Sequence, residues 1–504
     1  MRRIRQHASA LRIFVLALFV YGLSARMWAH AVSLAPHYVY LAQSLLHGHV
    51  DLIQLPPTTY DLLQFNGRWF VAGSPMPSIL MLPFVAIFGT GFSDVLFSVV
   101  LGAIDVALVY SLLGVFIHHG DTEAQRKAGN ASGLCASVVI SESARRWITL
   151  LFALGTPFWY LASLGTYWFT AHVVVVFFAL LATREALTRQ RWFLAGLWLA
   201  CAGFARPTAL FLTPFFLIIM LYAARRSSLR FPLYVLRSLL LFGLAMTILL
   251  GAHFAYNFAR FKSVTDFGYA YVTGADNITS AYARYGGFNL RFAPCNLAVS
   301  LLSPPEVNGA VPAFITQACA YLLEGVNLAD ASAPITPNPL GMSIFFVTPA
   351  LLIVFVTLKP AGESNHLHCD RRRFGAVHVS RLRGSSADRR PAPTKSDALR
   401  PWRWPIGQWL TRRGFQPPAP IVIAAWIGLL TTLTPLWLYH NTGSLQFGWR
   451  YLFDAAPMWI ILLAAGMQKV TRLKQGLILV SMAINLWGLL WMFEKLNGVR
   501  WWRF

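Results

Sequence analysis

Residues 77–89, with the sequence PSILMLPFVAIFG, decide how this chain is threaded through a membrane. The stretch is strongly apolar, but its 13 residues are fewer than the roughly 20 that an α-helix needs to cross a hydrocarbon core of about 30 Å. We therefore predict a helix that lies at the membrane interface, or re-enters the membrane, without crossing it. Counting this stretch as a span would reverse the side of every later segment.

Eleven other apolar segments are expected to cross the membrane. The predicted fold is therefore an all-α integral membrane protein with interfacial helices in its first outside loop. The segments lie at about 11–31, 92–117, 147–163, 167–187, 193–206, 207–223, 233–256, 341–358, 419–438, 453–468 and 475–493. With 77–89 left out of the count, the basic runs between segments fall on the side of the N-terminus. Because basic loops stay cytoplasmic, we predict a cytoplasmic N-terminus in a multi-pass protein of the inner (plasma) membrane.

The chain divides into three predicted parts. A transmembrane core covers 1–358 and includes the outside loops 32–76 and 257–340, and further transmembrane helices occupy 419–504. Between them, residues 359–418 form a basic cytoplasmic insert that is expected to be disordered. Its histidines and Cys369 are better explained by a solvated basic segment than by a metal site. In the second outside loop, Cys295 and Cys319 either form a disulfide or remain free thiols.

The positive charge of the chain bears on its partners. A formal net charge of +23 would indicate nucleic acid in a soluble protein. Here the basic residues lie mainly between apolar segments, so anionic lipids and control of topology explain them better. We therefore expect membrane lipids, and no nucleic acid, as partners.

The first outside loop carries an ordered set of motifs. Residues 35–52, APHYVYLAQSLLHGHVDL, contain aromatic residues followed by an A-x-x-L-L-x-G pattern. Residues 56–89 contain a Gly-Arg-aromatic turn and a Pro-x-Pro that leads into the short apolar stretch. In this order the motifs resemble the GT-C superfamily of polytopic glycosyltransferases, which includes protein O-mannosyltransferases and aminoarabinose transferases. Residues 153–187, 194–216 and 447–466 resemble later spans of bacterial members, so the resemblance covers most of the chain outside the insert.

The resemblance implies a GT-C-like fold and a glycosyltransferase. Such an enzyme would move a sugar from a polyprenyl-phosphate donor to an acceptor of the cell envelope, at the outer face of the cytoplasmic membrane. The family places an acidic pair just before the helix of the first loop, where this chain has Pro36-His37. Three alternatives follow: His37 is the base, a downstream carboxylate is the base, or the activity is altered or lost.

Asp51 and Asp61 are the carboxylates of that loop. Transfer from a lipid phosphate needs a carboxylate that takes the proton of the acceptor. Asp61 is preferred because it lies just before the Gly-Arg-aromatic turn. A helix cap or an Asx turn would explain either residue without catalysis.

Arginines near the outer ends of predicted spans are candidates for holding the phosphate. Arg206 interrupts an apolar stretch, and an arginine at membrane depth costs about 2.5–3.5 kcal/mol unless it reaches a partner or the interface. Arg450 is the second candidate, although Asp454 offers it an i,i+4 ion pair. The other predicted substrate-binding residues carry groups suited to a sugar and are His172, Tyr256, Asp266 and Arg284.

Several alternatives stay open. GT-C enzymes differ in metal dependence, so a divalent cation held with help from His37 and His172 is one possible cofactor, and no metal ligands are assigned. A transporter would need ionisable groups near the membrane midplane, for which the sequence offers Asp105 and Arg206. A non-catalytic scaffold of the same architecture would explain the loss of the acidic pair.

Overall fold

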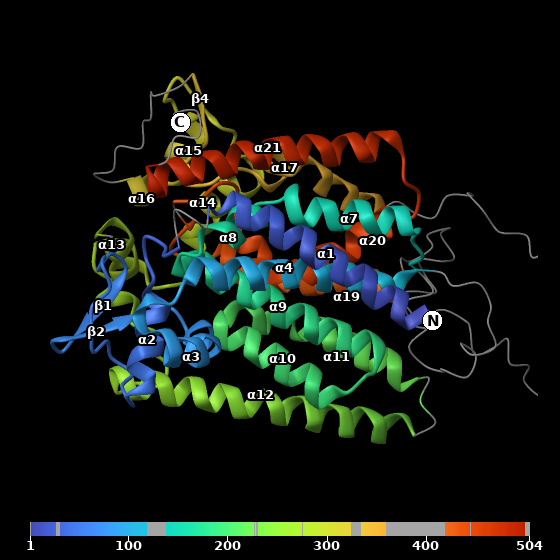
Figure 1. The fold of residues 1–504 in the computed structure, drawn as a ribbon, viewed down its shortest axis with the longest axis horizontal. Coiled ribbons are helices and arrows are strands. Elements are labelled where there is room, and N and C mark those ends of the chain that lie inside the picture. The colour runs from blue at the N-terminus through green and yellow to red at the C-terminus, as the bar shows by residue number, and fades with distance from the viewer. Residues whose placement is uncertain are drawn as a thin grey trace, which may run out of the picture.

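The computed structural model describes residues 2–26, 31–117, 138–225, 227, 230–274, 276–323, 334–358, 419–443 and 445–498. The predicted insert, with its histidines and Cys369, lies outside the described residues. Within them the chain is mostly helical, and long helices run side by side with small loops and two short sheets between them (Figure 1).

Six helices in the described ranges are long and apolar enough to cross a membrane. They are Asp94–Phe116 (α4 with η2), Tyr167–Thr188 (α9), Pro207–Ala224 (η3 with α11), Phe231–Phe261 (α12), Pro420–Trp437 (α19) and Arg472–Asn497 (α21). A seventh span results if α7 (Glu142–Leu154) and α8 (Phe158–Leu164), which meet at a bend of 52°, cross together. The chain is therefore a mostly helical membrane protein.

The remaining predicted spans coincide with helices outside this set, so the number eleven stays a prediction. These helices are α1 (Arg2–Ser24), α10 (Trp192–Ala205), η7 (Pro349–Leu358) and α20 (Ala456–Gly466). The 14 residues of α10 extend about 21 Å at 1.5 Å per residue, less than a hydrocarbon core of about 30 Å. The stretch 77–89 falls in α3 (Met76–Phe88), a helix of 13 residues, as its length and composition predict.

The centre of the bundle is α9. It packs against α4, α8, α10 and α20, and the apolar run at 173–176 is fully buried. A helix that is apolar on all sides is typical of a buried position. By contrast, α12 lies at the edge of the bundle and exposes most of its surface (Figure 1). Side chains on the first turns of α9 are therefore enclosed by several neighbouring elements.

Short elements connect the long helices. They are α2 (His37–Leu46), β1 (Leu62–Phe65), β2 (Arg68–Val71), η1 (Gly89–Gly91), η4 (Tyr269–Tyr271), α13 (Asp276–Tyr285), η5 (Leu290–Phe292), α14 (Ala293–Leu297), η6 (Ala298–Leu302), β3 (Glu306–Val307), α15 (Ala313–Ala318), α16 (Ala320–Leu323), β4 (Ile335–Thr336), α17 (Ile344–Val347) and η9 (Arg450–Ala455). The hairpin β1–β2 and the helices α2, α3 and α13 gather at the end of the bundle opposite the N-terminus (Figure 1).

Arg260, near the C-terminal end of α12, links the hairpin β1–β2 to the bundle through a hydrogen bond. In β1–β2 the strands pair antiparallel, with Leu62 opposite Val71. Arg260 donates from Nη1 to the Val71 carbonyl oxygen at 3.1 Å and from Nη2 to Asn257 Oδ1 at 2.7 Å. Since Arg260 is buried, these hydrogen bonds fix where the loop before β1 can lie.

The predicted second outside loop, residues 257–340, contains a disulfide. A disulfide was one of the two alternatives for its cysteines, the other being free thiols. Cys295 of α14 and Cys319, directly after α15, are bonded to each other and fully buried. The bond ties α14 to α15 across a separation of 24 residues.

The contact between α10 and α12 generates a test of the fold. A Cβ atom at Gly196 would lie 2.5 Å from the Phe242 carbonyl oxygen, whereas a Cβ at Gly243, on α12, meets nothing within 4 Å. We expect Gly196→Ala to lower the stability by about 1–3 kcal/mol because backbone would have to move. Gly243→Ala is the matched control and should be neutral or mildly stabilising. Thermal unfolding in detergent micelles measures both, and equal melting temperatures would contradict this packing.

Candidate functional site

The start of α9 carries three side chains that organise the site. A left-handed glycine, Gly165 (φ 68°), ends α8 and lets the chain turn into α9. No other residue fits there, because a Cβ atom would lie 2.6 Å from Val95 Cα. On the first turns of α9, Trp168, Phe169 and His172 lie at spacings of one, three and four residues. Such spacings place them on neighbouring parts of one helix face.

Trp168 holds the preferred base of the first loop. Asp61 lies just before β1 in a left-handed conformation, with φ of 61°, and its amide donates to the Thr273 carbonyl oxygen at 2.9 Å. Its Oδ2 accepts a hydrogen bond of 2.7 Å from Trp168 Nε1. Burial raises the pKa of Asp61, while the hydrogen bonds from Trp168 and Tyr167 and the charge of Arg450 act in the opposite direction. Asp61 is therefore a fixed, partly buried carboxylate within the electrostatic range of Arg450.

A second, fully buried carboxylate joins three distant segments. Asp454 Oδ1 lies 3.1 Å from His172 Nδ1, and both of its oxygens accept from Arg206 Nε, at 2.9 and 3.0 Å. The Thr208 hydroxyl donates to Oδ2. Arg206 stands between α10 and η3 with extended backbone (φ −146°, ψ 115°), because the residue before a proline is disfavoured in the helical region.

This pairing differs from the ion pair between Arg450 and Asp454 that four-residue spacing allows. Both residues lie in η9, which is a 3-10 helix. At three residues per turn, positions i and i+4 no longer share a face. Asp454 is therefore bonded to Arg206 across 248 positions, and Arg450 points elsewhere.

Arg450 forms no ion pair among the residues that the structure describes, although its charge acts on Asp61 at longer range. Its side chain is only 7% exposed, and Nε is enclosed without a hydrogen-bond partner in the part of the chain that the structure describes. The guanidinium carbon lies 5.5 Å from the ring centre of Phe169 and 5.8 Å from that of Tyr451. Arg206 approaches the same Tyr451 ring, at 5.1 Å. Two guanidinium groups thus flank one tyrosine, and only one of them has a carboxylate partner.

The other two candidate bases are less well placed. His37 is buried and stacks on Tyr167 at 4.4 Å, with Nε2 3.1 Å from the Thr58 carbonyl oxygen. Since a carbonyl can only accept, Nε2 carries the proton, and the unprotonated Nδ1 is enclosed without a partner among the described residues. Asp51 stays within its own loop, 3.4 Å from His49 and 4.0 Å from Arg68.

Three predicted substrate-binding residues make separate contacts. Tyr256 is buried beneath Arg260, whose guanidinium carbon lies 4.1 Å from its ring centre. Asp266 accepts from the Gly268 amide at 2.7 Å, which makes it a turn residue. Arg284 is exposed on α13. None of these contacts includes Asp61, Asp454 or Arg450.

Four residues of the site escaped the sequence analysis. They are Thr208, Phe169, Tyr451 and Trp168 as the partner of Asp61. Thr208 and Tyr451 each lie within two residues of a singled-out arginine, so proximity along the chain was the only available signal.

The residues described do not form a metal site. Within the described ranges, no group of three or more His, Cys, Asp or Glu residues is placed to hold an ion. His37 and His172, which were considered together for a divalent cation, make their contacts separately, with Thr58 and with Asp454.

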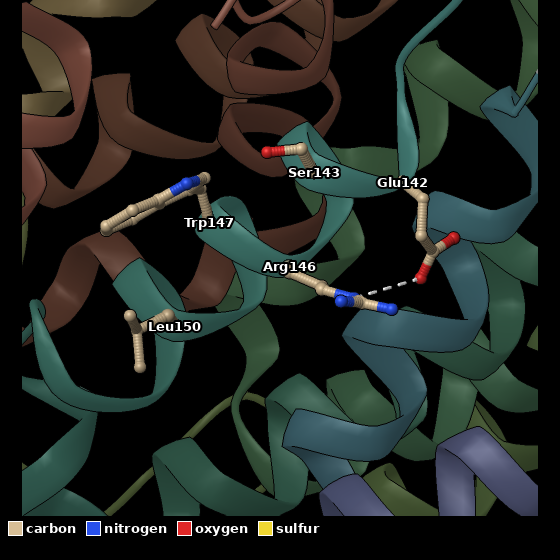
Figure 2. A pocket seen from close by; sticks show the side chains of 5 residues that line it. All are labelled: Glu142, Ser143, Arg146, Trp147 and Leu150. Atoms are coloured by element: carbon tan, nitrogen blue, oxygen red, sulfur yellow. Dashed lines mark ion pairs between the residues drawn. The ribbon is translucent and has the colours of Figure 1, made fainter. Parts of the chain in front are cut away.

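A surface hollow of about 510 Å³ lies elsewhere, at the start of α7. Figure 2 shows the residues that line it, which are Glu142, Ser143, Arg146, Trp147 and Leu150. Glu142 is paired with Arg146 at 3.6 Å and accepts from the Tyr110 hydroxyl, near the end of α4. No candidate site residue lines this hollow.

Comparisons with known proteins add no assignment. No family model, no curated protein and no solved structure matches the chain. The GT-C resemblance therefore remains an expectation from the motifs. A function can be inferred only from these motifs and from the geometry around Asp61, Asp454 and Arg450.

The buried His37 generates a prediction about pH. Burial lowers the pKa of His37 from 6.5 to about 4, opposed by its hydrogen bond to Thr58. Between these values the unfolded state binds more protons than the folded state, so stability falls as the pH is lowered from about 6.5 to 4. The loss from this residue amounts to about 3 kcal/mol. His37→Phe should reduce the slope of melting temperature against pH in detergent micelles, and an unchanged slope would contradict the assignment.

The Arg206–Asp454 pair generates a second prediction. Removing either partner leaves a buried charge uncompensated, which costs about 3–5 kcal/mol. Because Arg206 is 21% exposed and Asp454 is not exposed, we expect Asp454→Leu to fall at the lower end of this range. The double variant with Arg206→Met should be less destabilised than the sum of the single variants by at least about 1 kcal/mol. Unfolding in detergent provides the four free energies, and additive effects would exclude the coupling.

Proposed function

We propose that this chain is an integral membrane glycosyltransferase of GT-C architecture. It moves a sugar from a polyprenyl-phosphate donor to an acceptor of the cell envelope, at the outer face of the cytoplasmic membrane. The observation that carries the proposal is the buried Arg450, whose Nε has no hydrogen-bond partner among the described residues and whose charge acts on the carboxylate of Asp61.

The charges of the site favour an anionic ligand. Asp454 pairs with Arg206, whereas Arg450 forms no ion pair among the described residues and acts on the carboxylate of Asp61 only at longer range. A buried charge without a contact partner is costly, so the guanidinium of Arg450 favours an anion in contact with it. The bond to Asp454 uses Nε of Arg206 and leaves its terminal nitrogens without a hydrogen bond among the described residues. A phosphate accepts hydrogen bonds from such groups at more than one oxygen.

Asp61 is the proposed base. One of its oxygens is held by Trp168, and burial raises its pKa, which makes the carboxylate a better proton acceptor. In the reaction the acceptor oxygen bonds to the anomeric carbon of the sugar and gives its proton to Asp61. The bond between that carbon and the phosphate oxygen breaks, and its electron pair leaves with the phosphate, whose charge Arg450 stabilises.

The membrane arrangement belongs to the same proposal. We infer eleven spans, an interfacial α3 and a cytoplasmic N-terminus in the inner membrane. In support, the hairpin β1–β2, which Asp61 directly precedes, lies at the end of the bundle opposite the N-terminus (Figure 1).

A non-catalytic scaffold is the second candidate. Its support is His37, which occupies the position of the acidic pair of the family, yet keeps its unprotonated nitrogen enclosed. A transporter has less support, because Asp105 is buried without a hydrogen-bond partner in the described part of the chain, where the group within its electrostatic range is the phenol of Tyr21.

Binding and transfer assays test the proposal together. The purified protein in nanodiscs should bind undecaprenyl phosphate, and Arg450→Met should weaken this binding at least tenfold, as expected for a lost charged hydrogen bond of about 1.5–3 kcal/mol. Arg291→Met is the matched control, because Arg291 is exposed and lies against Tyr285. Asp61→Asn should retain binding but lose sugar transfer to envelope acceptors.

The results of these assays distinguish the glycosyltransferase from the non-catalytic scaffold. Equal binding by Arg450→Met and wild type would exclude the phosphate site. Binding by wild type with no transfer from any polyprenyl-phosphate sugar would favour the scaffold.

A further inference from the structure

His172 has a defined protonation pattern because of Asp454. The carboxylate accepts from Arg206 and Thr208, so it is an acceptor toward His172 as well. The proton of the imidazole therefore sits on Nδ1, and Nε2 presents a bare lone pair. His172 is fully buried, and Nε2 has no hydrogen-bond partner in the described part of the structure.

His172 and Arg450 both lie near the ring of Tyr451. The ring centre of His172 is 5.9 Å from that of Tyr451, and the guanidinium carbon of Arg450 is 5.8 Å from the same ring. Phe169, three residues before His172 on α9, has its ring centre 5.5 Å from the guanidinium carbon of Arg450. An acceptor, His172 Nε2, and a donor, Arg450 Nε, are therefore both buried around one tyrosine without a hydrogen-bond partner among the described residues.

We propose that His172 Nε2 accepts a hydrogen bond from the hydroxyl next to the anomeric carbon of the donor sugar. This inference rests on the proposed function and adds a class of substrate to it. A glycosyl phosphate carries both groups that the region lacks, namely phosphate oxygens for Arg450 and a nearby hydroxyl donor for His172. The donor is therefore a 2-hydroxy sugar, and 2-deoxy sugars are disfavoured because they leave the buried lone pair unpaired.

A hydrogen bond to His172 would change the difference in affinity between ligands that carry the hydroxyl and ligands that lack it. A single neutral hydrogen bond contributes a factor of about five to ten in affinity. His172 should therefore affect the preference between sugars and leave the binding of a sugar-free lipid phosphate almost unchanged. Loss of a merely structural histidine would weaken all ligands together.

Binding to the full-length protein in nanodiscs tests this assignment. The probes are undecaprenyl phosphate and its glucosyl, mannosyl and 2-deoxyglucosyl derivatives, the last being the deoxy analogue of both hexoses. Wild type should bind one hexosyl probe about five- to tenfold more tightly than the deoxy probe. His172→Asn, whose amide still donates to Asp454 but places no acceptor at the position of Nε2, should abolish this preference. It should bind undecaprenyl phosphate within about twofold of wild type.

Two further variants complete the design. His172→Phe keeps the volume of the ring and serves if His172→Asn does not fold, as judged by its melting temperature. Arg291→Met changes an exposed residue outside the site and leaves Nε2 in place, so it should keep the preference of wild type.

Three results would be decisive against the proposals. If wild type does not distinguish the hexosyl from the deoxy probes, or if His172→Asn keeps the full preference, Nε2 is satisfied by water and the inference is wrong. If wild type does not bind undecaprenyl phosphate at all, the proposed function itself fails.

Discussion

The site depends on one buried carboxylate. Asp454 accepts hydrogen bonds from His172 on α9 and from Arg206 and Thr208 at the break between α10 and η3. In a region of low polarity such a group is tolerated only when its lone pairs are satisfied and its charge is balanced. Asp454 meets both conditions, and in doing so it fixes the orientation of three side chains from two distant parts of the chain.

The pairing of Asp454 with Arg206 also explains why Asp454 does not pair with Arg450. Because η9 is a 3-10 helix and Asp454 is paired with Arg206, Arg450 has aromatic rings for neighbours and forms no ion pair within the described part of the chain. The rings contribute a weak attraction for a cation, about 0.5–2 kcal/mol, which offsets only part of the cost of burying it. This arrangement supports the proposed binding of an anion, and Asp61, on which the charge of Arg450 acts, is the proposed proton acceptor.

The sequence predicted the local features better than the long-range ones. The length of 77–89 predicted the short helix α3, and polar residues in apolar surroundings singled out Arg206, His172 and Arg450. The pairing of Arg206 with Asp454 spans 248 positions and follows from how the helices pack, which periodicity does not contain. Likewise, the four-residue spacing of Arg450 and Asp454 allowed an α-helical ion pair, which the 3-10 geometry of η9 separates.

The bond between Cys295 and Cys319 has a consequence for the sidedness of the protein. Such bonds persist in oxidising compartments and are rare where glutathione and thioredoxin keep thiols reduced. The segment that carries it also belongs to the outside loop expected from the distribution of basic residues, an argument based on charge alone. Redox chemistry and charge are thus independent supports for the proposal that this loop lies outside, and under that proposal the loop is translocated before the two thiols are joined.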